Sequence, residues 1–302
     1  MVRLLDGSMS AQLKHFGYDC NSAENIPHWT FPANSDESLV ANAYKSFLDL
    51  GVTDITTNTY HFGSTLDKRI PENDSKKKIY EKYFKIACSS LVKLTEMKDG
   101  VRVWGSVGTL ATLYHDMSEY NGKYMDNEDA ENTACNYYQT ILTLFQNKTN
   151  VRNLVFETIP SAVEGLMALE ALKRFPEMRA VMSFTFKKNA CLRHGEKIDT
   201  LAGELRKVSQ IVGMGINCTD PENVLPALKV IKKHNFPEVF VYPNMGDTKF
   251  LNERSDESDV FNLDMVTGWV ENGATAIGGC CGVTETQMKI LKKIVDNLNN
   301  AK

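Results

Sequence analysis

The chain has 302 residues, of which 42% are hydrophobic and 24% are charged, and its formal net charge is −4. This composition allows a sizeable core, and the weak negative charge gives no electrostatic reason to expect nucleic acid or an anionic membrane as a partner. No segment approaches the roughly 20 apolar residues of a membrane span, and the first residues do not resemble a signal peptide. We therefore expect a cytoplasmic protein, in which seven cysteines favour a metal or catalytic site over disulfides.

Along the chain, short runs rich in Val, Ile and aromatic residues alternate with longer segments of helical periodicity. The short runs lack strict alternation of polar and apolar residues, as is typical of parallel strands buried on both faces. They predict strands over 2–6, 52–57, 101–107, 151–157, 179–184, 211–217, 238–242 and 274–278. The periodic segments predict helices over 36–50, 74–98, 128–148, 161–175, 199–210, 221–235, 259–272 and 284–300.

Eight strands, each followed by a helix, predict a single (β/α)8 barrel that spans residues 1–302 as one domain. A doubly wound open sheet is the structural competitor. That fold requires a glycine-rich phosphate loop after the first strand, but this chain has Asp6-Gly7-Ser8 there. The barrel is therefore the better interpretation.

Barrel enzymes place their chemistry at the carboxyl ends of the strands, so the residues at those ends are candidates for a site. Three of them, Cys218, Cys280 and Cys281, are cysteines, and Glu157 is an acidic residue within a hydrophobic run. Three thiolates suit zinc and leave a fourth position for substrate. From spacing alone, buried structural cysteines or a disulfide between Cys280 and Cys281 remain equally open.

Seven segments of the chain resemble the homocysteine S-methyltransferase family, which is related to betaine–homocysteine methyltransferase and to the homocysteine domain of methionine synthase. The last three segments in the chain are the most specific in combination. The seven are LLDGSMSAQL (4–13), DITTNTY (54–60), GSVG (105–108), FETIP (156–160), GINCTDPENV (215–224), VYPNMG (241–246) and AIGGCCG (276–282).

The resemblance implies a zinc-dependent barrel enzyme that transfers a methyl group to the sulfur of homocysteine and forms methionine. It implies that Cys218, Cys280 and Cys281 hold Zn²⁺, and that the substrate thiolate, with no protein nucleophile, attacks the donor methyl. Further residues are expected to contact substrates. Asp6 and Glu157 would bind the ammonium of homocysteine, Asn217 and Asn244 would orient the site, and Trp29 and Tyr60 would face a cationic donor.

The methyl donor is the open part of this expectation. S-methylmethionine or S-adenosylmethionine is favoured, with a betaine- or selenol-directed methyltransferase as alternatives within the family. The chain departs from the common family pattern at Gly282, where arginine often follows the paired cysteines, and at His61-Phe62-Gly63 after the TNTY segment. A non-catalytic zinc- or thiol-binding protein and a thiol–disulfide oxidoreductase are alternatives from other classes.

Three long loops follow predicted strands, at 109–127, 185–198 and 245–258. We expect them to shape the donor pocket or to form a subunit contact, so an oligomer is left open. The expected partners are homocysteine and a small methyl donor.

Overall fold

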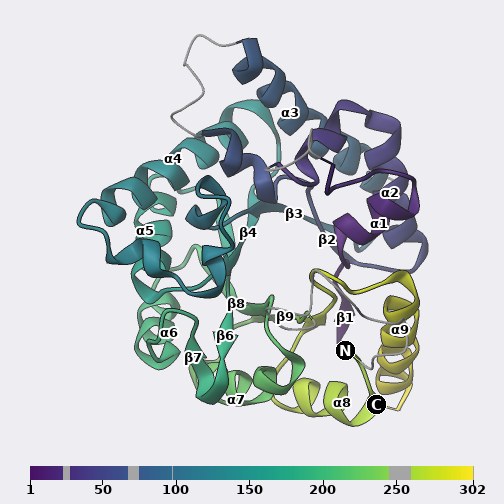
Figure 1. Ribbon diagram of the computed structural model, residues 1–302. Coiled ribbons are helices and arrows are strands. Elements are labelled where there is room, and N and C mark those ends of the chain that lie inside the picture. The colour runs from purple at the N-terminus through teal and green to yellow at the C-terminus, as the bar shows by residue number, and fades with distance from the viewer. Residues whose placement is uncertain (23–27, 67–74, 97, 245–259, 302) are drawn as a thin grey trace.

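The computed structural model describes residues 1–22, 28–66, 75–96, 98–244 and 260–301. Within these ranges, eight parallel strands form one sheet in the order β1-β10-β9-β8-β5-β4-β3-β2. A parallel bridge between Leu5 and Asp54 brings β1 next to β2 and closes the sheet into a barrel. Figure 1 shows the helices arranged as a ring around the strands. The predicted (β/α)8 barrel is confirmed.

The barrel strands match the predicted ones in order and position, but the first, second and last are only two or three residues long and therefore shorter than predicted. They are β1 (Arg3–Leu4), β2 (Asp54–Thr56), β3 (Arg102–Val107), β4 (Asn153–Ile159), β5 (Arg179–Phe184), β8 (Ile211–Asn217), β9 (Glu238–Tyr242) and β10 (Ala276–Ile277). The main helices are α2 (Glu37–Asp49), α3 (Ser75–Thr95), α4 (Ala130–Lys148), α5 (Ala162–Leu172), α6 (Ile198–Arg206), α7 (Pro221–Ile231), α8 (Leu263–Glu271) and α9 (Glu285–Asn300).

The structure adds elements that the sequence pattern did not predict. A short helix, α1 (Met9–His15), follows β1, and an antiparallel pair, β6 (Phe186–Lys187) with β7 (Cys191–Leu192), lies in the loop after β5. These elements are too short to generate a clear periodic pattern. Several 3₁₀ turns occur, including η2 (Tyr60–Leu66) after β2 and η4 (Ser118–Tyr120) after β3. The long loop at 245–258 lies outside the described residues.

The two ends of the chain lie beside each other, as Figure 1 shows. The side chain of Asn299 accepts a hydrogen bond from the backbone N–H of Val2 at 2.9 Å and donates one to its carbonyl at 2.8 Å. Helix α9 begins with a capping box between Thr284 and Gln287. In the described part of the chain, no helix is long and apolar enough to cross a membrane.

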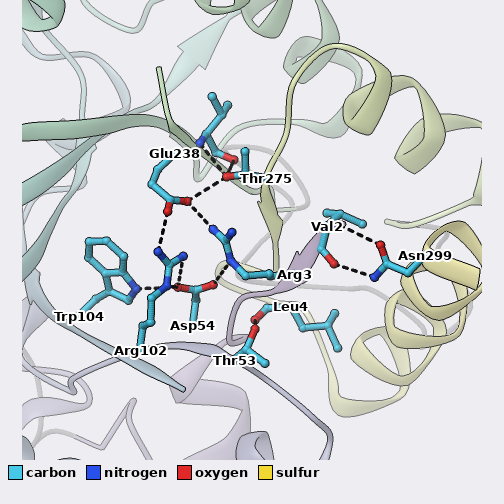
Figure 2. Close-up of polar contacts among 11 residues, drawn as sticks. Val2, Arg3, Leu4, Thr53, Asp54, Arg102, Trp104, Glu238, Thr275 and Asn299 are labelled. Atoms are coloured by element: carbon cyan, nitrogen blue, oxygen red, sulfur yellow. Dashed lines mark hydrogen bonds and ion pairs between the residues drawn. The ribbon is translucent and has the colours of Figure 1, made fainter. Parts of the chain in front are cut away.

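A network of charged residues lies at the amino ends of the strands, opposite the carboxyl ends that carry the candidate site. Asp54 is fully buried and lies between Arg3 and Arg102, which also reach Glu238, as Figure 2 shows. Arg3 Nε is 2.8 Å and Arg102 Nη2 is 2.7 Å from the Asp54 carboxylate. Trp104 donates an indole hydrogen bond to Asp54 at 2.9 Å. The network joins β1, β2, β3 and β9 across the barrel.

The loop between β3 and α4 is held over the other end of the barrel by a buried carboxylate. Glu164, in the first turn of α5, accepts hydrogen bonds from Thr109, from the backbone of Leu110 and from the hydroxyls of Tyr124 and Tyr138. Four donors satisfy a charge that would otherwise be costly to bury. The loop is therefore anchored at Thr109–Leu110 and at Tyr124, and the segment between these points extends over the strand ends.

Candidate functional site

Three cysteine sulfurs meet at the carboxyl ends of the barrel strands. Cys218 directly follows β8, and Cys280 and Cys281 follow β10. The three Sγ atoms all lie within 4.8 Å of one another, although Cys218 is 62 positions from Cys280 in sequence. Among the described residues, no other group of three or more His, Cys, Asp or Glu side chains is placed to hold a metal ion.

The backbone at Cys218 is held in an unusual conformation by its neighbours. Its φ is 43°, in the left-handed region that non-glycine residues seldom adopt. The preceding residue, Asn217, accepts hydrogen bonds from Thr158 N at 2.9 Å and Ser183 Oγ at 2.7 Å, and donates one to Thr158 Oγ1 at 2.8 Å. Thr185 Oγ1 donates to the Cys218 carbonyl at 2.8 Å. Asn217 therefore joins three strand ends just before the cysteine, which gives it a positioning role.

Glycines before Cys280 and Cys281 bring these two cysteines close to the end of the first strand, β1. A Cβ on Gly278 would overlap the carbonyl oxygen of Asp6, so only glycine allows β10 to leave the barrel along this path. Gly279 N then donates to that Asp6 oxygen at 3.0 Å, and Cys280 N donates to Pro243 O at 2.9 Å. These backbone contacts place the two cysteines between the ends of β1 and β9.

The chemistry of this sulfur set fits a zinc ion. Zinc takes thiolates at about 2.3 Å in a tetrahedron, which would separate the sulfurs by roughly 3.8 Å, and three sulfurs that all lie within 4.8 Å of one another are close enough to reach one ion. In the structure Cys218 and Cys280 are joined as a disulfide, with Cα atoms 5.7 Å apart, and Cys281 is free. The alternative of a Cys280–Cys281 disulfide is therefore wrong. The form that could bind a metal is the one in which Cys218 and Cys280 are reduced.

Two buried carboxylates, Asp6 after β1 and Glu157 on β4, belong to the same rim although their strands are not neighbours in the barrel. Asp6 accepts hydrogen bonds from Thr56 N at 2.7 Å and Thr56 Oγ1 at 2.8 Å. Burial raises the pKa of Asp6 to about 8, Thr56 offsets part of the rise, and the charge of Glu157 adds to it. Burial also raises the pKa of Glu157 to about 7, against hydrogen bonding from Ser106 and Tyr242. Because their pKa values are raised, both carboxyl groups are partly protonated near neutral pH. A bound cation would favour their ionised forms, so the pair suits a cationic ligand.

We expect Asp6→Asn to be more stable than the wild type at pH 8.5, by on the order of 5 kcal/mol, because each unit of pKa rise corresponds to about 1.4 kcal/mol. The pKa of Asp6 is higher in the folded than in the unfolded chain, so ionisation costs stability. This cost is absent below about pH 4 and is complete above about pH 8. Asparagine keeps an oxygen for both Thr56 hydrogen bonds and does not ionise. Urea unfolding at pH 4 and 8.5 measures the difference, with the exposed Asp264→Asn as control. A variant less stable than the wild type at both pH values would contradict this account.

The two aromatic candidates, Trp29 and Tyr60, both contact the ring of His61. Burial raises the pKa of Tyr60, and the nearby Glu119, Cys281 and Glu157 raise it further, so these groups surround its hydroxyl. The ring of His61 lies 4.7 Å from that of Tyr60 and stacks on Trp29 at 6.1 Å. Trp29 is thus joined to the site through His61, whereas Tyr60 lies beside the carboxylate and a thiol.

Asn244, a residue predicted from the sequence, is buried, and its Nδ2 donates to the hydroxyl of Tyr120 at 3.3 Å. Tyr120 and two other residues near the site were not predicted. Tyr120 and Glu119 come from the long loop after β3, and Arg193 comes from the loop after β5. The sequence signal for them was only the unusual length of these loops. Ser106 donates a hydrogen bond to Glu157, and Ser183 donates one to Asn217.

Fold and site together define a parallel barrel with a thiol-based candidate metal centre and buried carboxylates at its carboxyl rim. The sequence pattern of the family described as "Homocysteine S-methyltransferase" matches residues 3–295. The chain therefore belongs to the homocysteine S-methyltransferase family, which transfers methyl groups to homocysteine or selenocysteine.

Curated relatives show the same similarity over most of the chain. Homocysteine S-methyltransferase YbgG of Bacillus subtilis is 26% identical over 92% of this chain and 89% of its own length. Homocysteine S-methyltransferase 2 of Zea mays is 25% identical over 98% of this chain and 91% of its own length. A selenocysteine methyltransferase of Astragalus bisulcatus is 27% identical over 65% of this chain and 60% of its own length.

Solved structures confirm the fold. The metallated form of the homocysteine methyltransferase MmuM from Escherichia coli has a TM-score of 0.78 and 22% identity, and it covers 97% of this chain and 96% of its own. The oxidized form of the same protein has a TM-score of 0.79 and 23% identity, and the match covers 97% of this chain and 95% of that one.

Proposed function

We propose that this chain is a zinc-dependent methyltransferase that transfers a methyl group from S-methylmethionine or S-adenosylmethionine to the thiolate of homocysteine. The observation that carries the proposal is the convergence of Cys218, Cys280 and Cys281 beside Asp6 and Glu157 at one rim of the barrel. With S-methylmethionine as donor, both products are methionine.

The cysteines would hold the ion, and the carboxylates would hold the substrate. Zinc bound by three thiolates would lower the pKa of a substrate thiol at its remaining position. Asp6 and Glu157 would bind the α-ammonium of homocysteine by charge-assisted hydrogen bonds. Asn217 would keep the end of β8 in place, and Asn244 would hold Tyr120 over the site.

The transfer itself removes two opposite charges. The bond between the methyl carbon and the donor sulfonium breaks, and its electron pair stays on the donor sulfur, which becomes a neutral thioether. The thiolate supplies the electron pair of the new carbon–sulfur bond. Because charge disappears, water exclusion by the loops over the rim would favour the reaction. Tyr60, beside Glu157 and Cys281, and Trp29 would face the donor cation.

Selenocysteine is a second candidate acceptor, because some relatives of the chain are selenocysteine methyltransferases. Asp6 and Glu157 would recognise the α-ammonium that homocysteine and selenocysteine share. The carboxylates therefore do not select between these acceptors.

A panel of donors and acceptors tests the proposal. We expect turnover of homocysteine with a sulfonium donor, and loss of that turnover when zinc is removed by a chelator under reducing conditions, with recovery on adding zinc back. Betaine and selenocysteine complete the panel. Full methyl transfer by chelator-treated, zinc-free protein would refute the proposal, and zinc binding without any homocysteine-dependent turnover would favour a non-catalytic protein.

The aromatic residues are tested with the same panel. We expect Trp29→Ala and Tyr60→Ala to raise KM for the sulfonium donor, with the larger effect at Tyr60 because it lies beside the thiol and the carboxylate. A cation–π contact at a desolvated site stabilises binding by about 2 kcal/mol, which predicts a change of roughly 30-fold. Unchanged donor kinetics in both variants would remove the aromatic wall from the proposal.

A further inference from the structure

A buried guanidinium lies next to the cysteine rim, on the loop between β5 and α6. Arg193 is only 8% exposed. Its backbone N–H donates to Thr185 O at 3.2 Å, and its Nε donates to Thr185 Oγ1 at 3.3 Å. The same hydroxyl donates to the carbonyl of Cys218 at 2.8 Å. One threonine thus fixes the position of Arg193 relative to a candidate metal ligand.

A tyrosine from another loop covers this guanidinium. The Arg193 Cζ atom lies 5.3 Å from the centroid of the Tyr120 ring. The hydroxyl of Tyr120 accepts a hydrogen bond from Asn244 Nδ2 at 3.3 Å. Cys280 N donates to Pro243 O at 2.9 Å, and Pro243 directly precedes Asn244, so the Tyr120 hydroxyl lies beside the segment that positions a rim cysteine. Arg193 and Tyr120 therefore meet beside the thiols, and both come from loops rather than from strands.

Charges of both signs lie at the rim. The acidic groups Asp6 and Glu157 stand on the strands or directly after them, whereas Arg193 and the acidic Glu119 belong to the loops that follow β5 and β3. In the proposed function the strand carboxylates bind the ammonium of the acceptor amino acid. The donor then approaches the acceptor sulfur from the loop side, where Arg193 places a positive charge. A zwitterionic donor would be oriented there, with its carboxylate toward the guanidinium and its cationic sulfur toward the acidic groups.

We propose that Arg193, supported by Tyr120, binds the carboxylate of the methyl donor, so that the enzyme selects a zwitterionic donor over a simple cation. The guanidinium offers a planar pair of N–H donors that matches a carboxylate. Thr185 fixes the Nε edge of that group, and the Tyr120 ring packs against it. This inference rests on the proposed function and extends it to the class of donor.

The test compares donors that differ only in the carboxylate. S-methylmethionine is paired with its carboxamide, and S-adenosylmethionine with its decarboxylated form, at saturating homocysteine. For Arg193→Gln we expect KM for the carboxylate-bearing donor to rise about 10- to 100-fold, with kcat within about 3-fold. KM for the matching carboxylate-free donor and for homocysteine should stay unchanged. Arg193→Lys should recover part of the loss, and Arg174→Gln, at an exposed position just after the end of α5, is the matched control.

Two results would overturn the inference. If Arg193→Gln raises KM for homocysteine instead, the guanidinium serves the acceptor. If zinc content falls and both members of a donor pair lose activity equally, Arg193 supports the metal site through Thr185 and Cys218.

Calorimetry separates the failure of this inference from that of the proposed function. If the wild type shows no turnover, donor binding is measured directly. Carboxylate-dependent binding that is lost in Arg193→Gln supports the inference although the proposed function has failed. Absence of any donor binding by the wild type, or binding of both members of a pair with equal affinity, refutes it.

Discussion

Replacing Cys280 with alanine is expected to abolish zinc binding and homocysteine methylation while leaving the barrel folded. The three sulfurs lie within 4.8 Å of one another, and removing one leaves two thiolate ligands, too few to hold the ion tightly. Changes to residues that only support metal ligands already cost 10- to 100-fold in affinity or activity. We therefore expect a loss of activity greater than about 100-fold.

The measurement is zinc content per chain and methyl transfer rate, both on reduced protein. Cys135→Ala is the matched control, because Cys135 is a partly buried residue on α4, outside the sulfur cluster. Cys218→Ala and Cys281→Ala should match Cys280→Ala in both readouts. Stoichiometric zinc and wild-type turnover in Cys280→Ala would show that the cluster is not a metal centre. Equal losses in Cys135→Ala would point to a general effect of cysteine removal.

Replacing Asp54 with alanine is expected to cause the largest loss of stability, about 2–4 kcal/mol. Asp54 is fully buried at the amino ends of the strands and pairs with Arg3 and Arg102, as Figure 2 shows. Its removal leaves the indole N–H of Trp104 without its acceptor and two guanidinium groups facing each other. Both arginines are about one-third exposed and keep Glu238, which limits the loss.

Urea unfolding and thermal melting measure this effect, and in a chain of 302 residues a loss of this size should lower Tm by about 3–6 °C. Glu37→Ala is the control, because Glu37 forms an exposed pair with Lys93 and surface pairs contribute at most about 1 kcal/mol. Asp54→Asn should lie between alanine and wild type, since it keeps an acceptor for Trp104. A midpoint for Asp54→Ala equal to that of Glu37→Ala would show that the network does not stabilise the barrel.

Most of the barrel could be predicted because its signals are local. The strand pattern at 211–217 and the helix pattern that begins at Pro221 depend on neighbouring residues, and the structure has both at those positions. The pattern also indicated that Cys218 and Cys280 would meet, because strands in a barrel end at one rim. The short helix α1 and the β6–β7 pair were missed because a few residues give no measurable period.

The surroundings of the thiols could not be predicted, because they depend on the paths of loops. Arg193 meets Tyr120 only because Glu164 anchors one loop and Thr185 holds the other. The side chain of Asn244 likewise reaches Tyr120, which is 124 positions away in the sequence. No periodicity connects such residues.

The sequence by itself determined the order of strands and helices, the barrel, and the three cysteines at its rim, since hydrophobic patterning and family motifs are properties of short segments. Tertiary structure alone decided that burial raises the pKa of both Asp6 and Glu157, and that the charge of Glu157 adds to the rise at Asp6. It also decided that Arg193 lies beside the cysteines. These properties depend on burial and on distances between residues far apart in sequence, which exist only once the barrel has closed.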